Sequence, residues 1–513
     1  MVPAETPRHL ESAAKRELAK ILAAGFLEEV FHPTDWCARS FYVQKPGAAD
    51  QEPRVRLVTD LRHINQIIKR VGHPLDGSTH ILRRLEPDDT YFSVMDLTSG
   101  YHQVPLDESC RDLFTVILPS GKYRFTVMPQ GCTASSDYFN LLTDENIRGK
   151  IGYFKNVDDL LTTSTSLDQL EDRVRALLHV CRRKNMKLAP SKFQLGRKVT
   201  YGGVVVEAAR QQGDTSAAVY LSPTEEKLRT FLDISTPSSK KEVQRIAGLA
   251  AQLKRWTPGL MLEFPGIQKL CSNSVPFLWN ADLEMELTRM KDAIGQHVKL
   301  SPLDVSKDLI LWTDAAPSVG MAYVLCQEKI PGNPEEGFNI IICDSTTFKR
   351  GKTVYSPFEA ELAVIHWACT KEDYYLRGAR NIVVKCDAKN MGSFLNQDLD
   401  KIVNPREQRM VERLMPYCIT VNHVPGKNTE VADFGSRHPA SEGLHEQFDT
   451  EQGRLGIMVR SRRVQSLDIV DPKVELLAAM ASEDSDYLKM LTDVINNTET
   501  KYLAAGSELR LLR

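Results

Sequence analysis

Two adjacent acids, Asp158 and Asp159, stand between short apolar runs in GYFKNVDDLLTTS, residues 152–164. A third acid, Asp96, ends the apolar strand-like run in DTYFSVMDL about sixty residues earlier. Carboxylates at the ends of apolar strands are costly to bury unless a cation compensates their charge. Such oxygen ligands suit Mg²⁺, which also binds substrate phosphates. An isolated Asp-Asp pair could equally be a solvated hairpin turn, because Asp favours turns.

A second set of acids is spread over the C-terminal half of the chain. Asp314 and Asp387 each follow an apolar strand-like run, Glu361 lies in an amphipathic helical segment, and Asp433 stands in VADFGSR. A strand–helix–strand layout could gather them around two metal ions, which stabilise the attacking and leaving oxygens of phosphoryl transfer. Each acid alone could instead be a capping or surface carboxylate, and we expect Glu359 to be a surface residue.

Helices are predicted beside the first set of acids. They cover three segments: residues 8–30, where apolar residues recur at helical spacing and Gly25 is a plausible C-terminal stop, residues 133–147, and residues 167–184. Ser166 can cap the third helix, and Gln169 can complete a capping box. One face of that helix carries six apolar residues: Leu167, Leu170, Val174, Leu177, Leu178 and Cys181.

Strands and further helices complete both halves of the chain. Hairpins are predicted for LFTVILPSGKYRFTVMP and, around a glycine turn, for VTYGGVVVE. Residues 208–222 are polar and are predicted to form a loop, whereas residues 223–300 read as mostly helical. From about residue 305, apolar strands alternate with helices, which indicates a mixed α/β domain around the second set of acids.

The composition is that of a globular protein with several domains. Its 513 residues exceed what one core usually holds, and 42% hydrophobic and 26% charged residues are ordinary values. Ten cysteines without a C-x-x-C pair argue for reduced thiols and against a zinc site. We expect no membrane span and no signal peptide. A net charge of −2 excludes a basic field over the whole protein that would indicate a nucleic-acid partner. The local clusters of Lys and Arg are then either ordinary solvated surface or the lining of one groove.

The motifs occur in the order of a reverse transcriptase of the Ty3/Gypsy-like retrotransposon type. FSVMDLTSGYHQVPL, FTVMPQGCTAS, VDDLL and YGGVVV resemble its polymerase part, and WTDAA, AELA, CDAKN and HVPGKNTEVADFGSRHP resemble its RNase H domain. The resemblance covers roughly residues 10–440. It implies an α+β multidomain fold: a right-hand polymerase with fingers, a ferredoxin-like palm and a helical thumb, followed by an α/β RNase H-like domain.

The resemblance also implies a division of the chain. The expected segments are fingers and palm (residues 1–222), a mostly helical thumb or connection (223–304), an RNase H-like domain (305–440), and a linker with the start of an integrase-type connector (441–513). The chain shows no protease Asp-Thr/Ser-Gly motif and no His-His/Cys-Cys integrase pattern. We therefore expect one segment of a larger Pol polyprotein, or a truncated reading frame, located in cytoplasmic virus-like particles or the nucleus.

In the polymerase part, the resemblance assigns Asp96, Asp158 and Asp159 to two Mg²⁺ ions, with Mn²⁺ as an alternative. A primer 3′-hydroxyl would attack the α-phosphate of an incoming dNTP there. The family's usual Tyr-x-Asp-Asp motif is changed, because Asn156 takes the place of the tyrosine. Since that tyrosine is not a metal ligand, we expect the chemistry to survive, with template positioning, nucleotide affinity or fidelity altered.

Further residues match nucleotide and primer contacts of the family. Tyr101 matches the steric gate that excludes a ribose 2′-hydroxyl, with core packing as its alternative role. Arg56 matches the triphosphate contact, Lys45 is a weaker match for a second phosphate contact, and Gln130 matches a residue near the dNTP sugar. The primer-grip hairpin corresponds to three residues: Tyr201, Gly202 and Gly203.

In the second domain, the resemblance assigns Asp314, Glu361, Asp387 and Asp433 to two Mg²⁺ ions. They would cleave the RNA strand of an RNA–DNA hybrid, leaving a 3′-hydroxyl. His423 lies on the strand before the last acid and is interpreted as structural. The expected partners are an RNA template, a DNA primer, the RNA–DNA hybrid and dNTPs, with other Pol or Gag segments and a dimer partner as further candidates.

Two other interpretations remain beside this enzyme with two activities. The chain could be a decayed or co-opted element that binds nucleic acid without polymerising, or a purely structural polyprotein segment. All seven acids are intact, and random substitution would have been expected to remove at least one. The sequence therefore favours an active reverse transcriptase with RNase H.

Overall fold

The structure is a computed structural model of the chain. It describes residues 3–45, 52–144, 147, 149–210, 217–317, 319–348, 355–425 and 457–458. The chain divides into two units, Met1–Arg460 and Ser461–Arg513, and all described residues lie in the first. Asp433 and almost all of the predicted connector (441–513) lie outside the described residues. No helix in the described ranges is both long and apolar enough to cross a membrane.

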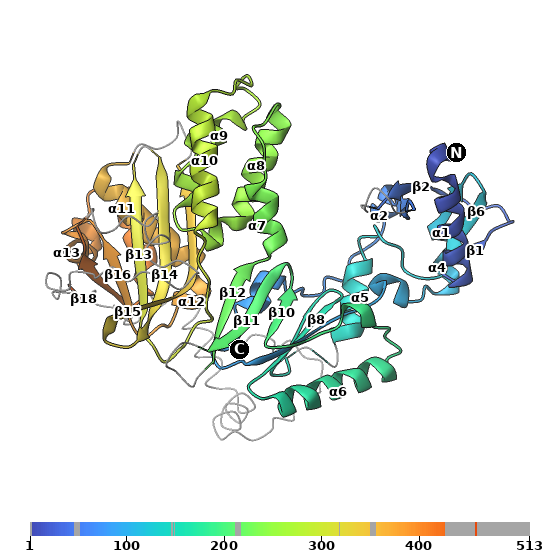
Figure 1. Cartoon of the computed structure of the whole chain (residues 1–513), viewed down its shortest axis with the longest axis horizontal. Helices are drawn as coiled ribbons and strands as arrows, with labels where there is room; N and C mark the ends of the chain where they lie inside the picture. The colour runs from blue at the N-terminus through green and yellow to red at the C-terminus, as the bar shows by residue number, and fades with distance from the viewer. Residues whose placement is uncertain are drawn as a thin grey trace, which may run out of the picture. The chain divides into compact units, whose positions relative to one another are not determined.

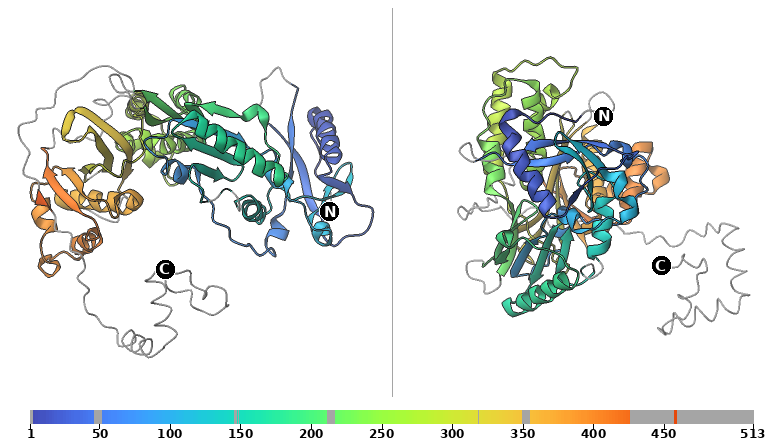
Figure 2. Two further views of the ribbon diagram at one scale, coloured as in Figure 1. Left: turned by 90° about the horizontal axis from the view of Figure 1, so that it is seen from below. Right: turned by 90° about the vertical axis from the view of Figure 1, so that its right-hand side faces the viewer.

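The N-terminal part is a helix and a five-stranded sheet. Its elements are α1 (Glu11–Ala23), β1 (Leu27–Glu29), β2 (Ala38–Gln44), β3 (Val55–Thr59), β5 (Thr115–Leu118) and β6 (Gly121–Phe125). The strands lie in the order β1-β6-β5-β2-β3, and β5 and β6 form the predicted hairpin. Helix α1 packs beside β3, and it lies in the dark blue N-terminal part of the ribbon (Figures 1 and 2). Gly25, at φ 71°, follows its C-terminal end, which confirms the predicted stop, and β1 begins soon after, so the helix does not extend to residue 30.

A four-stranded antiparallel sheet comes next and carries the first set of acids. Its strands are β4 (Tyr91–Asp96), β7 (Tyr153–Asn156), β8 (Asp159–Ser164) and β9 (Gln194–Gly196), in the order β7-β8-β4-β9. Helices α5 (Ser135–Asp144) and α6 (Leu167–Arg183) confirm two predicted helices. The short helices of this region are α2 (Arg62–Asn65), α3 (Ser78–Leu82) and α4 (Glu108–Arg111).

Helix α6 buries a narrower stripe than the sequence suggested. Its buried residues are Leu170, Val174, Leu177 and Cys181. Leu167 and Leu178 are 48% and 44% exposed, because they lie at the flanks of the stripe. Ser166 accepts the backbone N–H of Gln169 at 3.3 Å, as predicted, but the Gln169 side chain accepts from Thr165 N. The capping box with Ser166 is therefore only half formed.

A three-stranded sheet and a group of helices follow. The strands β10 (Lys198–Tyr201), β11 (Val204–Arg210) and β12 (Ala217–Pro223) lie in this order, and β10 and β11 form the predicted glycine hairpin. The predicted loop over 208–222 is wrong: β12 pairs with β11 from Ala217↔Arg210 to Pro223↔Val204. Its alternating residues Val219 and Leu221 are buried, which stabilises a strand where the flanking polar residues had suggested a loop.

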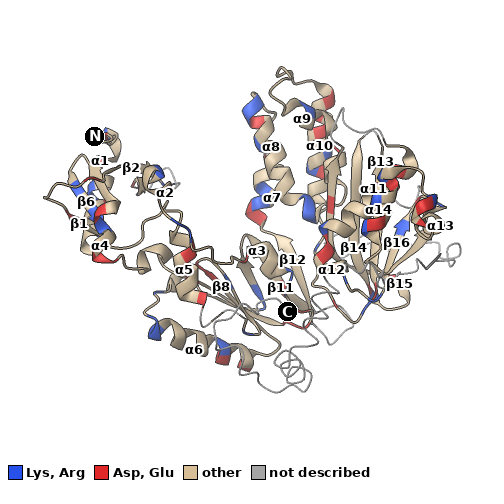
Figure 3. Cartoon of the chain, turned by 180° about the vertical axis from the view of Figure 1, so that it is seen from behind, with Lys and Arg blue, Asp and Glu red and all other residues tan. Residues whose placement is uncertain are grey.

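Helices dominate the next eighty residues, as predicted. They are α7 (Glu225–Leu232), α8 (Lys240–Leu253), α9 (Pro265–Leu270) and α10 (Ala281–Gly295). On α6 the acidic residues lie in the N-terminal half and basic residues lie at the C-terminal end (Figure 3), so both signs of charge are present, in keeping with a net charge of −2. The predicted domain boundaries after residues 222 and 304 stay predictions.

The C-terminal part is a six-stranded sheet with helices. Its strands are β13 (Leu309–Ala316), β14 (Gly320–Ile330), β15 (Asn333–Thr347), β16 (Ile382–Cys386), β17 (Ile419–His423) and β18 (Ile457–Met458), in the order β15-β14-β13-β16-β17-β18. Its helices are α11 (Pro357–Lys371), α12 (Asp373–Leu376), α13 (Met391–Leu395) and α14 (Pro405–Leu414). β13, β16 and β17 are parallel, and α11 packs against β13 (Figure 1). The alternation of strands and helices confirms the predicted α/β domain.

A buried carboxylate joins the C-terminal sheet to the part of the chain that carries the first set of acids. Glu372 is 0% exposed. It accepts a hydrogen bond from the Tyr323 hydroxyl at 2.6 Å, and Arg83 Nη2 donates to its other oxygen at 2.9 Å. The Arg83 guanidinium also lies 5.3 Å from the centre of the Tyr375 ring. A buried charge is tolerable only when it is paired in this way.

This pair makes a stability prediction. Arg83→Met leaves Glu372 in the interior without its ionic partner, and we expect it to lower the free energy of unfolding by about 3 kcal/mol. The matched control is Arg229→Met, because the Arg229–Glu225 pair is 71% and 76% exposed and should matter far less. Urea unfolding of both variants measures the difference. Equal losses would contradict the special weight given to the buried pair.

Candidate active sites

The first set of acids lies at adjoining ends of neighbouring strands. Asp96 ends β4 and Asp159 begins β8, and the two residues are directly paired across the antiparallel strands. The Leu97 N–H donates to the Asp158 carbonyl at 2.9 Å, which ties Asp158 to the end of β4. The structure therefore brings Asp96 next to the Asp158–Asp159 corner, as the sequence predicted.

The turn that carries Asp158 is strained. Val157 has φ 56°, in the left-handed region that β-branched residues avoid. Such a conformation costs on the order of 1–3 kcal/mol and persists only where the surrounding structure enforces it. Here the pairing Asn156↔Asp159 closes the hairpin over two residues and holds both acids at the strand ends.

The electrostatics of these acids call for a cation. Burial raises the pKa of Asp159 first, and the charges of Asp158 and Asp96 raise it further. Lys192 Nζ donates to Asp96 Oδ2 at 2.7 Å, and this bond raises the pKa of the lysine. Sequence reasoning missed Lys192. The available signal was its place just before the strand in SKFQLG, since β9 pairs with β4.

These residues fit a hard divalent cation in their chemistry. The acids repel one another at one corner, and a lysine ammonium already occupies part of the place that a cation would take at Asp96. In the described part of the chain, however, no three His, Cys, Asp or Glu side chains are gathered closely enough to hold a metal ion. The carboxylates would have to turn toward one another on binding.

The predicted phosphate contacts lie together on the β2–β3 hairpin. Arg56 pairs with Val43 across the hairpin, and Lys45 N donates to Arg54 O at 2.7 Å. Since alternate residues of a strand share a face, Lys45 and Arg56 lie on the same face, and both are exposed. Gln130 is also exposed, in the turn after β6.

The remaining predicted contacts differ in their surroundings. Tyr101 is partly buried in a 3-10 helix, η2 (Gly100–Gln103). Gly202 and Gly203, at φ 55° and 72°, form the turn of the β10–β11 hairpin, and a Cβ on Gly202 would lie 2.6 Å from Ser78 Cβ. Tyr201 is 1% exposed, so its side chain cannot face a primer. Burial and then the charge of Asp159 raise the pKa of Tyr201.

Three acids of the second set converge in the C-terminal domain. β13 and β16 are parallel with Trp312 opposite Lys385, which places Asp314 and Asp387 at neighbouring strand ends. Glu361 comes from α11, against β13. Burial raises the pKa of Glu361 to about 8, with contributions from Asp314 and Asp387, while the Ala315 backbone N–H opposes the shift.

A divalent cation fits this second site as well. Glu361 Oε2 is buried and has no hydrogen-bond partner among the described residues. Such an orphaned acid oxygen beside two more carboxylates is a donor set suited to Mg²⁺. Asp433, the fourth predicted ligand, lies outside the described residues, so its assignment stays a prediction.

Two further residues refine this site. His423 Nε2 lies 3.6 Å from Asp387 Oδ1, because β17 pairs with β16 and places His423 opposite Cys386. A residue interpreted as structural therefore borders the candidate ligands. The expectation that Glu359 is a surface residue is wrong: it is 8% exposed, caps α11 with Ser356 and accepts from Asn404 Nδ2 at 2.8 Å.

Two protein families match separate ranges of the chain. Residues 43–206 match the family "Reverse transcriptase (RNA-dependent DNA polymerase)". Residues 304–417 match the "RNase H-like domain found in reverse transcriptase". The two matched ranges contain the acids of the first set and three acids of the second set.

Curated relatives include two Pol polyproteins of Drosophila melanogaster. The retrovirus-related Pol polyprotein from transposon 412 is 26% identical over 406 residues, which cover 77% of this chain and 30% of the relative. That from transposon gypsy is 27% identical over 437 residues, which cover 82% of this chain and 40% of the relative. The chain thus spans less than half the length of these relatives.

Solved structures confirm the fold. The foamy viral protease-reverse transcriptase in complex with dsDNA has a TM-score of 0.68 and 19% identity, over 83% of this chain and 85% of that one. The same protein in complex with an RNA/DNA hybrid has a TM-score of 0.66 and 18% identity, over 88% of this chain and 57% of that one. The predicted fold class, a polymerase followed by an RNase H-like domain, is therefore confirmed. The chain belongs to the reverse transcriptase and RNase H part of the Pol polyprotein family of LTR retrotransposons.

Proposed function

We propose that this chain is an RNA- and DNA-templated DNA polymerase with RNase H activity, which copies retrotransposon RNA into DNA. The observation that carries the proposal is the pairing of Asp96 with Asp159 beside Asp158, within the range that matches reverse transcriptases. Its partners would be an RNA template, a DNA primer, the hybrid and dNTPs. Its location would be a cytoplasmic virus-like particle or the nucleus.

In the polymerase site, Asp96, Asp158 and Asp159 would hold two Mg²⁺ ions, with Mn²⁺ as a substitute. Bound Mg²⁺ would supply the charge that stabilises the attacking 3′-oxygen and the leaving pyrophosphate. Until then Lys192 compensates Asp96 and keeps the acids together at the corner. The chemistry of the chain itself is therefore mainly positioning and charge compensation.

Other residues would orient the substrates. Lys45 and Arg56, which share a face of the β2–β3 hairpin, suit the triphosphate, and Gln130 suits the sugar. Tyr101 would exclude a ribose 2′-hydroxyl. The turn at Gly202 and Gly203 would hold the primer end through backbone groups, since its neighbour Tyr201 is buried.

In the RNase H site, Asp314, Glu361 and Asp387, with Asp433 as the predicted fourth acid, would hold two Mg²⁺ ions. Bound Mg²⁺ would activate the water that cleaves the RNA strand and leaves a 3′-hydroxyl. His423 borders Asp387 and limits the directions in which that carboxylate can turn. Hybrid would be recognised mainly through phosphates and 2′-hydroxyls, so little sequence preference is expected.

Primer extension on an RNA template tests the polymerase. We expect Mg²⁺-dependent extension by the parent chain and a loss of about three orders of magnitude in Asp158→Asn, because several kcal/mol of charge stabilisation depend on the bound metal. Asp172→Asn, at an exposed position on α6, is the matched control and should extend normally. A folded parent that cannot extend any primer would favour the nucleic-acid-binding element over the enzyme.

Cleavage of a labelled RNA–DNA hybrid tests the second site. We expect Asp387→Asn to stop cleavage while primer extension continues, because Asp387 follows β16 of the C-terminal sheet, whereas the polymerase acids lie at strand ends of another sheet. The control is Asp398→Asn, whose side chain is 47% exposed in a surface pair with Lys401. Loss of both activities in Asp387→Asn alone would contradict two separate sites.

Glu361 predicts a pH dependence in the absence of metal. Its pKa of about 8 lies above the ordinary 4.5, so between these values the folded chain keeps a proton that the unfolded chain has released. The stability that this group contributes is complete below about pH 4.5 and is lost as pH rises through about 8. In EDTA, the parent should therefore melt at a lower temperature at pH 8.5 than at pH 6.5.

Glu361→Gln is the control for this effect, because it keeps the shape of the side chain and cannot titrate. Its melting temperature should change less between the same two pH values. Since Mg²⁺ must displace the proton, the Mg²⁺ concentration that half-saturates hybrid cleavage should also fall as pH rises toward about 8. Identical pH profiles of parent and variant would mean that Glu361 is already ionised at neutral pH.

A further inference from the structure

The aromatic ring of Phe139 lies against Tyr101, the predicted steric gate. Phe139 stands on α5 and is 1% exposed. The centres of the two rings are 5.7 Å apart with an angle of 88° between the planes. This edge-to-face geometry is the arrangement that aromatic pairs prefer, and it is worth about 0.5–1.5 kcal/mol beyond area burial. Phe139 therefore limits where the Tyr101 ring can go.

The backbone before Tyr101 also packs on Phe139. A Cβ on Gly100 would lie 3.0 Å from Phe139 Cζ, and two further ring atoms would be at 3.3 and 3.4 Å. Gly100 therefore lets the ring approach the 3-10 helix η2 at a distance that a larger residue would not permit. Both the ring of Tyr101 and the backbone that carries it thus rest on the same side chain.

On another side, Phe139 meets the hairpin that carries the polymerase acids. Lys155, the residue before Asn156 on β7, places its Nζ 5.3 Å from the centre of the Phe139 ring. That side chain is only 4% exposed, and a desolvated ammonium is attracted to a ring face by up to about 2 kcal/mol. Lys155 therefore links β7 to Phe139 in the interior.

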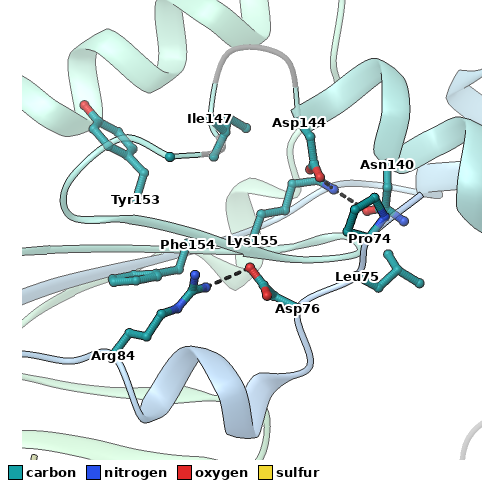
Figure 4. A pocket seen from close by; sticks show the side chains of 11 residues that line it. Pro74, Leu75, Asp76, Arg84, Asn140, Asp144, Ile147, Tyr153, Phe154 and Lys155 are labelled. Carbon is teal, nitrogen blue, oxygen red and sulfur yellow. Dashed lines mark hydrogen bonds and ion pairs between the residues drawn. The ribbon is translucent and has the colours of Figure 1, made fainter. Parts of the chain in front are cut away.

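Two polar residues of α5 keep Lys155 in this place. Its Nζ donates to Asp144 Oδ1 at 2.8 Å and to Asn140 Oδ1 (Figure 4). His73, in the loop between α2 and α3, places its Nε2 2.8 Å from the other oxygen of Asp144 and so links that loop to the same carboxylate. Figure 4 shows Lys155 pointing toward these α5 side chains, along one side of a small pocket behind the hairpin.

We propose that Phe139 is a positioning residue for sugar selection: held by Lys155, it fixes the Tyr101 ring that excludes the ribose 2′-hydroxyl. The inference rests on the proposed polymerase function and deepens it by adding a residue that need not touch the nucleotide. Tyr101 is only partly buried, so without Phe139 its ring gains room to move away from the sugar. A ribonucleotide would then fit.

Ordinary core packing makes a different prediction, which separates the two roles. A residue that only fills the core changes stability and affects all substrates alike. A residue that sets the gate changes the ratio of kcat/KM for a dNTP to kcat/KM for the matching rNTP. Single-nucleotide primer extension measures this ratio, and thermal unfolding measures the stability of each variant in parallel.

The variants are Tyr101→Val, Phe139→Leu and Phe139→Met, with Lys155→Met to remove the cation beside the ring. We expect each to lower the dNTP/rNTP ratio, the Phe139 variants by about tenfold, the scale on which a pocket discriminates one small group. Phe231→Leu is the matched control: Phe231 is a 0% exposed core residue of α7, and the ratio should stay at the parent value.

The outcomes separate the proposed polymerase function from the positioning role of Phe139. A parent chain that incorporates no dNTP overturns the proposed function, and this inference with it. A parent that extends primers, with an unchanged ratio in the Phe139 variants that fold, overturns the positioning role alone. An unchanged ratio in Tyr101→Val removes the gate and the inference together. A lower ratio in Phe139 variants, but not in Phe231→Leu, supports it.

Discussion

The compensation of carboxylates at the ends of apolar strands is the constraint on which the rest of this structure depends. Burial and neighbouring acids raise the pKa of both Asp159 and Glu361. The negative charge is compensated differently in the two sites. Lys192 gives Asp96 an ammonium, whereas Glu361 lowers its own charge by keeping a proton near neutral pH. In the proposed function a divalent cation would replace both, because an ammonium can move aside and a proton can be released.

The two sites reach the same arrangement through opposite strand directions. In the polymerase part β4 and β8 are antiparallel, so the end of one strand meets the start of the next, and a hairpin turn can supply two acids at once. In the RNase H-like part β13 and β16 are parallel, so each strand supplies one acid at its C-terminal end. A third acid must then come from elsewhere, and α11 supplies Glu361 because it packs against β13. The spacing of the acids along the chain follows from these topologies.

The sequence was sufficient to predict that Asp96 lies beside the Asp158–Asp159 pair, and insufficient for the residues that surround them. Asp96 and Asp158–Asp159 stand beside strongly apolar runs, which predict buried strands and do form β4 and β8. The strand β12 was missed because the polar residues before it outweighed its short alternating pattern. Glu359 was misplaced because its burial depends on Asn404 and Arg406, about forty-five residues away. Lys192 stands just before a strand-like run, but nothing in that run indicates its partner Asp96, which is 96 residues distant. Contacts between remote segments leave no local pattern.

The hairpin β7–β8 combines two demands that would conflict on a single face. The proposed metal binding needs mutually repelling carboxylates gathered at the turn, whereas the proposed sugar selection needs a rigid apolar support. Because successive residues of a strand point to opposite sides, Lys155 can face α5 and the Phe139 ring while Asn156, its neighbour, faces the other way. The replacement of the family's tyrosine by Asn156 therefore changes one side of β7 and leaves the Lys155 side intact. This separation explains how the turn motif can vary while the acids and the aromatic support behind Tyr101 remain in place.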